Sequence, residues 1–275
     1  MWVLFAHAAK YALILMLVLS CLTACGQSVT PETSTDAAAT ASNQFMPQKV
    51  APEAPISELE WENYKFPLLA LNEEKGLYLY GVWPRGVVLY TGNTGQFFDW
   101  GFDSPRRFYP KIFTGDFDKD GDADVAISVY AKSGTGLSVE DLHLLKKVID
   151  SYGWHYSDYA VSEDALEAQL QENITYRFHE HSISLLYNGA EQIFSVAEYT
   201  ANPQEPVTLS GVNYTNIISY EQEGDQIIAS FGAGFTAKEY AAPTFFATVR
   251  AAVQFMNSGI RLKDIQIQPI DSDSP

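Results

Sequence analysis

Short apolar runs dominate the chain from residue 77 onward, and turn-forming residues separate them. The first runs are Leu77–Tyr80, Val87–Tyr90 and Gln96–Trp100, and a later one spans Val125–Tyr130. They are rich in Val, Tyr and Phe, which favour strands, and segments rich in Gly, Pro, Asn and Thr lie between the first three. The pattern predicts short β-strands joined by tight turns.

Three further turns predict β-hairpins. Asn188-Gly189 lies between Ile183–Leu186 and Gln192–Val196, and Asn-Gly between such runs is a strong hairpin signal. The other two predicted turns are Glu223-Gly224-Asp225 and Asn257-Ser258-Gly259, the latter joining Phe245–Phe255 to Ile260–Ile267. No internal repeat of 20–50 residues is visible, which argues against a propeller or solenoid encoded in tandem.

One helix is predicted from Glu163 to Gln171. Ser162 stands in the N-cap position, and two acids occupy the first turn, where the helix dipole favours negative charge. Residues 138–149 are ambiguous, because they begin like a capping box and carry leucines on a helical face, yet periodicity does not exclude a strand. Together these patterns predict a mainly β, α+β fold of antiparallel sheets and hairpins with one or two short helices.

The amino terminus has a different pattern. Lys10 precedes an apolar run, Tyr11–Leu19, which is shorter than the about 20 residues of a spanning helix. Leu22-Thr23-Ala24-Cys25 follows and resembles the bacterial lipobox, in which the cysteine thiol takes a diacylglycerol and the peptide is cut just before it. The resemblance implies a signal peptide over residues 1–24 and a lipid on Cys25. The alternative is an uncleaved membrane anchor.

Residues 25–58 are rich in Ser, Thr, Ala, Pro and Gln, and predict a disordered tether between the membrane and the folded part. Residues 59–200 are predicted to form a β-rich domain, and residues 201–270 a C-terminal hairpin region of the same globule. The predicted location is the extracytoplasmic side of the cell membrane. The second residue of the predicted mature chain is Gly26 and not the Asp that retains enterobacterial lipoproteins in the inner membrane, and the choice between inner and outer membrane stays open.

The net charge of the predicted mature chain limits the classes of partner that it can bind. Removal of residues 1–24 takes away Lys10 and no acid, which leaves 16 Lys and Arg against 34 Asp and Glu, a net charge of −18. Such a balance argues against nucleic acid and against electrostatic adhesion to anionic lipid, so the acyl chains must hold the protein at the membrane. The only cysteines are Cys21 and Cys25, so no disulfide is expected within the fold.

The most informative stretch for chemistry runs from Gly115 to Ile127. Five aspartates alternate over nine residues: Asp116, Asp118, Asp120, Asp122 and Asp124. Calcium takes six to eight oxygen ligands, and a tight loop presents them from alternating positions. Gly121 at the sixth position permits the sharp turn. We expect side-chain ligands from Asp116, Asp118, Asp120 and Asp124, and the backbone carbonyl of Asp122.

An EF-hand does not fit this loop. Its twelfth position requires a bidentate Glu, and this chain has Ile127 there, followed by a strand-like segment in place of a helix. The loop resembles instead the D-x-D-x-D-G-x-x-D calcium loop of FG-GAP and VCBS-type repeats, which joins two strands of a propeller blade. The alternative interpretation is an ordinary solvated turn.

The resemblance extends over roughly residues 60–200, through Tyr78–Gly81, Phe98–Trp100, Gly134–Gly136 and Glu140–His143 in this order. Together they look like a group of uncharacterised secreted or lipid-anchored bacterial proteins, mainly Gram-positive, with a single VCBS-like loop. In that group the segment after the Gly-Thr-Gly is extended, which favours a strand over residues 139–148. The resemblance supplies no catalytic residues.

Weaker patterns have ordinary explanations. His179 and His181 share a strand face and would suit zinc, but no third ligand is identifiable by spacing. The aromatic residues between positions 78 and 109 suit a sugar-stacking face or, more often, a core. The sequence predicts a lipid-anchored calcium-binding module whose partners are extracellular polysaccharide, cell wall or protein. The alternative is a hydrolase of such polymers, although no hydrolase motif occurs.

Overall fold

The computed structural model describes residues 67–82, 86–101, 109–151, 153–202, 204, 206–256 and 259–270. The predicted signal peptide, Cys25 and the predicted tether lie outside these residues. Within them, no helix combines the length and the apolar character that crossing a membrane requires.

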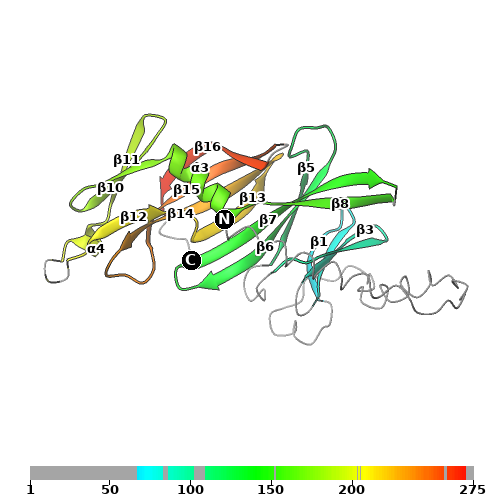
Figure 1. Cartoon of the computed structure of the whole chain (residues 1–275), viewed down its shortest axis with the longest axis horizontal. Coiled ribbons are helices and arrows are strands. Elements are labelled where there is room, and N and C mark those ends of the chain that lie inside the picture. The colour runs from blue at the N-terminus through cyan, green and yellow to red at the C-terminus, as the bar shows by residue number, and fades with distance from the viewer. Residues whose placement is uncertain are drawn as a thin grey trace, which may run out of the picture. The chain divides into compact units, whose positions relative to one another are not determined.

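The described residues form a mainly β structure with two helices, which confirms the predicted fold class (Figure 1). The first eight strands are β1 (Leu68–Asn72), β2 (Leu77–Gly81), β3 (Val87–Thr91), β4 (Thr94–Phe98), β5 (Lys111–Gly115), β6 (Asp124–Gly134), β7 (Leu137–Asp150) and β8 (Gly153–Ala160). The remaining elements are α3 (Glu163–Asn173), β9 (Thr175–Phe178), β10 (Ser182–Tyr187), β11 (Ala190–Ser195), α4 (Ala197–Thr200), β12 (Leu209–Asn213), β13 (Ile217–Glu223), β14 (Gln226–Ala237), β15 (Thr244–Met256) and β16 (Gly259–Pro269).

The predicted hairpin at Asn188-Gly189 is confirmed. These two residues join β10 to β11, and both have positive φ, 49° and 78°, as a two-residue type I′ turn requires. Gly224 and Asp225 join β13 to β14 as predicted, with Glu223 paired to Gln226. Strands β15 and β16 also pair as predicted, while Asn257 and Ser258 between them lie outside the described residues.

The helix prediction is confirmed at its start. α3 begins at Glu163, and the Ser162 hydroxyl accepts the Ala165 N–H at 3.4 Å. The helix continues to Asn173, two residues beyond the predicted end. The ambiguous segment is a strand, β7, as the family resemblance implied. Its apparent helical face arises because both faces of β7 are buried, so leucines occur on each side of the strand.

A four-stranded antiparallel meander, β1-β2-β3-β4, forms the first sheet. One face packs its apolar side chains, including Leu79 and Leu89, against Ile127 and Leu145 of β6 and β7. The other face carries Tyr78, Tyr80, Val88 and Tyr90 in a cluster of their own, with the Tyr80 and Tyr90 rings edge to face at 5.9 Å. These tyrosines are buried, so they belong to the core and not to an exposed sugar-stacking face.

The second sheet contains nine strands in the order β16-β15-β14-β13-β7-β6-β5, with β8 on β7 and β12 on β14. All its pairings are antiparallel except that of β13 with β7, which is parallel and covers only two residue pairs. This short contact joins the strands before residue 200 to those after it. The predicted regions 59–200 and 201–270 therefore contribute strands to one sheet.

Where β13 separates from β7, the side chains of Glu140 and Lys111 bond the backbone of β13. The Tyr220 N–H donates to Glu140 Oε2 at 3.0 Å, and the Tyr220 carbonyl accepts from Lys111 Nζ at 2.9 Å. Lys111 also donates to Glu140 Oε1 at 2.7 Å, and the Ser128 hydroxyl donates to Glu140 Oε2 at 2.6 Å. Glu140 is 6% exposed, so its carboxylate is a buried polar junction between β5, β6, β7 and β13.

The main core lies between β5–β7, β13–β16, α3 and the three-stranded sheet β11-β10-β9. α3 contributes Leu166 and Leu170, which are buried. β14 supplies two fully buried rings, Phe231 and Phe235. Consecutive residues of β14 are buried, so both of its faces are covered, and most of its residues are apolar.

The side-chain amides of three glutamines bond the backbone of a strand as a neighbouring strand would, with one bond to an N–H and one to a carbonyl. Gln96 bonds both the N–H and the carbonyl of Tyr156 on β8, each at 2.8 Å. Gln169 of α3 bonds the Ile260 carbonyl at 3.2 Å and the Leu262 N–H at 2.9 Å on β16. Gln222 bonds the carbonyl and N–H of Thr114 on β5. Each amide satisfies backbone groups of an edge strand that would otherwise face solvent.

Candidate metal site

The aspartate-rich loop joins two neighbouring antiparallel strands, as the sequence predicted. Gly115, the last residue of β5, pairs with Asp124, the first residue of β6, and residues 116–123 form the connection. The β5–β6 pair belongs to the nine-stranded sheet. The loop is therefore fixed at both ends by the sheet, which limits how far its side chains move apart.

Three of the five predicted ligand residues converge. Asp116, Asp118 and Asp120 each offer a carboxylate oxygen, and the three oxygens lie within 4.8 Å of one another. This is the one such cluster of three or more potential metal-ligating side chains among the described residues. Carboxylates at this separation repel one another unless a cation lies between or beside them.

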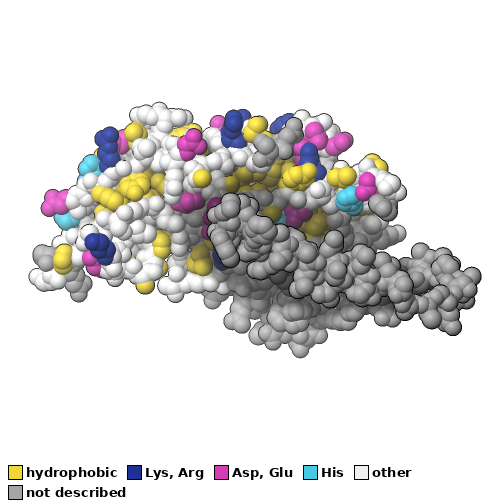
Figure 2. Space-filling view, in the orientation of Figure 1, with side chains coloured by type: hydrophobic (Ala, Val, Ile, Leu, Met, Phe, Trp, Pro, Cys, Tyr) yellow, Lys and Arg dark blue, Asp and Glu magenta, His cyan; other side chains and the backbone are white. Residues whose placement is uncertain are grey.

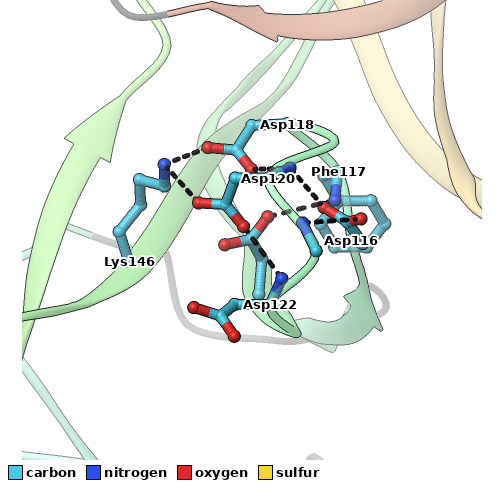
Figure 3. A network of polar contacts seen from close by, with 8 residues as sticks. Asp116, Phe117, Asp118, Asp120, Asp122 and Lys146 are labelled. Atoms are coloured by element: carbon cyan, nitrogen blue, oxygen red, sulfur yellow. Dashed lines mark hydrogen bonds and ion pairs between the residues drawn. The ribbon is translucent and has the colours of Figure 1, made fainter.

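Backbone amides hold the carboxylates in place (Figure 3). The Asp120 N–H donates to Asp116 Oδ1 at 3.0 Å, and the Gly121 N–H donates to Asp116 Oδ2 at 3.1 Å. The Asp122 N–H donates to Asp120 Oδ1 at 3.0 Å. Lys119 and Gly121 have positive φ, 65° and 96°, and this winding turns alternate side chains to the same side of the loop.

Asp122 and Asp124 are placed differently. Asp124 is 4% exposed, and its Oδ2 accepts the Phe117 N–H at 3.0 Å across the base of the loop. Burial, and after it the negative charge of Asp118, raises the pKa of Asp124 to about 6. Asp122 is exposed, and it contributes its N–H to the Asp120 carboxylate. Neither side chain belongs to the group of three oxygens.

Lys146 is the residue that sequence reasoning missed. It comes from β7, and its ammonium contacts Asp118 Oδ2 closely and Asp120 Oδ2 at 3.3 Å. Figure 3 shows the side chain reaching the two carboxylates from outside the loop. The Asp122 N–H and then Lys146 lower the pKa of Asp120, and the Asp118 hydrogen bond raises the pKa of Lys146. No local signal links positions 118 and 146.

Two cavities border the loop, and Lys146 and Tyr159 line both. One has a volume of about 370 Å³ and lies between Asp118, the start of α3 and the β15–β16 hairpin. The other has a volume of about 630 Å³ and is lined by Asp120, Asp122 and Asp124 among others. The acidic loop is therefore reached by solvent on two sides, which gives a small ion a path to it.

The chemistry of the donor set fits a hard cation. Three carboxylates carry three negative charges against the single ammonium of Lys146, so negative charge remains in excess. All donors are oxygens, which suit Ca²⁺ or Mg²⁺ and not the nitrogen and sulfur sites typical of zinc. The flexible coordination of Ca²⁺ suits a loop that carries additional carboxylates at Asp122 and Asp124.

The two histidines considered for zinc have separate partners. His179 Nε2 lies 3.3 Å from Ser184 Oγ, whereas His181 Nδ1 lies 3.0 Å from Thr200 Oγ1. They do not belong to any cluster of three ligating side chains among the described residues. Thr135 and Gly136 join β6 to β7, and Gly136 has positive φ.

A third histidine forms an ordered pair that the sequence did not indicate. His143 of β7 is 7% exposed, and its Nδ1 lies 3.0 Å from Asp158 Oδ2 on β8. Trp100 stacks on the imidazole at 3.9 Å between ring centroids and donates its indole N–H to Asp158 at 2.7 Å. His143 is therefore buried beneath the Trp100 ring and paired with a carboxylate of the neighbouring strand.

No family model matches the chain, and no curated protein or solved structure matches it significantly.

Proposed function

We propose that this chain is a lipid-anchored, extracytoplasmic calcium-binding protein that acts as a binding or envelope-associated module. The observation that carries the calcium proposal is the convergence of Asp116, Asp118 and Asp120 oxygens within 4.8 Å on a loop fixed by two strands. The loop's likeness to FG-GAP and VCBS calcium loops supports the same conclusion. The anchoring proposal depends on Leu22–Cys25 and on the polar segment that follows.

A bound calcium ion would stabilise the fold by neutralising the aspartates of the loop between β5 and β6. The loop links β5 to β6, and β6 packs Ile127 and Val129 against the four-stranded sheet and Ala126 into the main core. Neutralising the carboxylates therefore removes repulsion at the end of the hairpin that joins the edge strand β5 to β6. Affinity in the micromolar-to-millimolar range is expected, as in other extracellular calcium modules.

Calcium is expected to raise the melting temperature of the full-length chain. At 10 mM Ca²⁺ and a Kd near 0.1 mM, mass action contributes about 2.7 kcal/mol, or about 5–10 °C for a fold of this size. The measurement is differential scanning fluorimetry in non-ionic detergent with 10 mM CaCl₂ and with EDTA. Mg²⁺ should give a smaller shift, because it demands a stricter octahedral geometry.

The double substitution D118N/D120N is the informative variant for this measurement, because it leaves the Asp116 hydrogen bonds to the loop intact. It should lose the calcium-dependent shift. The control is Glu180→Gln, a carboxylate that is 91% exposed and remote from the loop in sequence. Equal melting temperatures in calcium and EDTA for the unmodified chain would remove the calcium proposal.

Replacement of Cys25 by serine is expected to release the protein from membranes. The acidic chain has little electrostatic attraction for anionic lipid, so without the thiol for diacylglycerol it should move to the soluble extracytoplasmic fraction. The measurement is ultracentrifugation of lysed cells followed by immunoblotting, with mass spectrometry of the amino-terminal peptide. Cys21→Ser is the matched control and should stay membrane-bound. Retention of Cys25→Ser in the membrane would favour the uncleaved anchor.

A binding module is the better supported of the two classes considered. Of the histidines, His143 is packed under Trp100, and His179 contacts the Ser184 hydroxyl. His181 lies near the Thr200 hydroxyl and, at 3.9 Å, the exposed Glu180 carboxylate. Figure 2 shows Lys and Arg side chains dispersed over the visible face of the described residues, mixed with Asp and Glu. This mixed surface suits a polysaccharide, cell-wall or protein partner better than nucleic acid.

A further inference from the structure

The ammonium of Lys146 is a positive charge in contact with the carboxylates to which the calcium proposal assigns a cation. It contacts Asp118 and Asp120, two of the three carboxylates of the cluster, and it comes from β7, 28 residues from Asp118 and 26 from Asp120. A positive group held on the cluster by another element is evidence, independent of the loop's own turns, that this place accepts a cation.

We propose that Lys146 is an internal counter-ion that competes with a divalent cation for Asp118 and Asp120, so that the loop exchanges an ammonium for a dication. This inference rests on the proposed calcium function and names the residue that sets its affinity. In the metal-free protein Lys146 neutralises part of the loop. On binding, the dication takes the carboxylate oxygens and repels the ammonium.

The surroundings of Lys146 permit this exchange. Its side chain is 28% exposed and lines both cavities beside the loop, so open volume lies on each side of it. The four-carbon stem of lysine rotates readily, and its point charge makes no fixed bidentate contact. Release of the ammonium therefore requires no movement of the sheet.

The neighbouring Lys147 provides a matched control. It lies on the same strand and carries the same charge, but its Nζ lies 5.2 Å from the Trp154 ring centroid, and it lines only the larger of the two cavities beside the loop. Removing either lysine changes the net charge equally. Only Lys146 contacts the carboxylates, so only its removal should change calcium affinity strongly.

The test compares calcium binding by the full-length chain, Lys146→Met and Lys147→Met, using isothermal titration calorimetry in non-ionic detergent. Loss of a positive charge from direct contact with the site should tighten the calcium Kd at least about tenfold in Lys146→Met. Lys147→Met should change it less than about threefold. In EDTA, Lys146→Met should melt below the unmodified chain, and saturating calcium should remove this difference.

A second measurement uses the unmodified chain and does not depend on the folding of a variant. Acetylation of lysines with an N-hydroxysuccinimide ester is followed by mass spectrometry in EDTA and in saturating calcium. Lys146 should react several-fold faster with calcium, while Lys147 should not change. Calcium binding by the unmodified chain with unchanged Kd in Lys146→Met, or with unchanged acetylation of Lys146, overturns the exchange and leaves the calcium function standing. Failure of all three proteins to bind calcium overturns both.

Discussion

Replacing Glu140 by alanine should lower the free energy of unfolding by about 3–5 kcal/mol. The carboxylate accepts from Lys111, from the Ser128 hydroxyl and from the Tyr220 N–H, and it is 6% exposed. Its loss leaves the Tyr220 N–H and the Ser128 hydroxyl buried without their acceptor, at the place where β13 separates from β7. Urea denaturation followed by circular dichroism measures the change.

Two further variants distinguish the loss of the Glu140 carboxylate as a hydrogen-bond acceptor from a simple loss of packing. Glu140→Gln keeps the volume but presents an NH₂ group to donors, so it should also lose about 2 kcal/mol or more. Glu163→Ala removes the exposed pair with Lys132 and should cost about 1 kcal/mol or less. If Glu140→Gln were as stable as the unmodified chain, the carboxylate would not be the junction described above.

Replacing Trp100 by alanine should cost about 3–5 kcal/mol and loosen the four-stranded sheet. Trp100 is 5% exposed, stacks on Phe98 and His143, and donates to Asp158 on β8. It is thus a main connection between the end of β4 and the β7–β8 hairpin. Hydrogen exchange should become faster across β1–β4 before it changes in β14 and β15.

Trp154 on β8 is the control for this variant. Its ring contacts Tyr156 edge to face and lies near Lys147, close to the turn of the β7–β8 hairpin, so Trp154→Ala should cost about 1 kcal/mol or less. Trp100→Phe retains a stacked ring and loses only the bond to Asp158, so its effect should be intermediate. Uniform acceleration of exchange through both sheets would contradict a local role for Trp100.

Part of the candidate site is predictable from the sequence, and part depends on the tertiary structure. The spacing of Asp116, Asp118 and Asp120 and the position of Gly121 are visible in the sequence, because a tight loop places alternating residues on one side. Asp124 was expected as a side-chain ligand, and the structure places its carboxylate on the Phe117 N–H. That difference depends on how β6 enters the sheet, since Asp124 is already its first strand residue.

Gln96, Gln169 and Gln222 show why long-range polar contacts escape sequence analysis. Each amide bonds backbone groups 60 to 108 residues away in the chain. A solitary glutamine in a strand or helix has no pattern that distinguishes it from a solvated surface residue. Its role appears only when another strand presents both an N–H and a carbonyl to it.

The sequence by itself determined the elements whose causes are local: the strands and their turns, the start of α3 at Ser162, the Asn188-Gly189 hairpin and the spacing of the acidic loop. Backbone preference and side-chain alternation over a few residues are sufficient for these. Only the tertiary structure decided that β13 joins β7, that Glu140 meets Tyr220, and that Lys146 reaches Asp118. These contacts join residues 28 to 80 positions apart, where the gain comes from mutual burial and charge and no short segment records it.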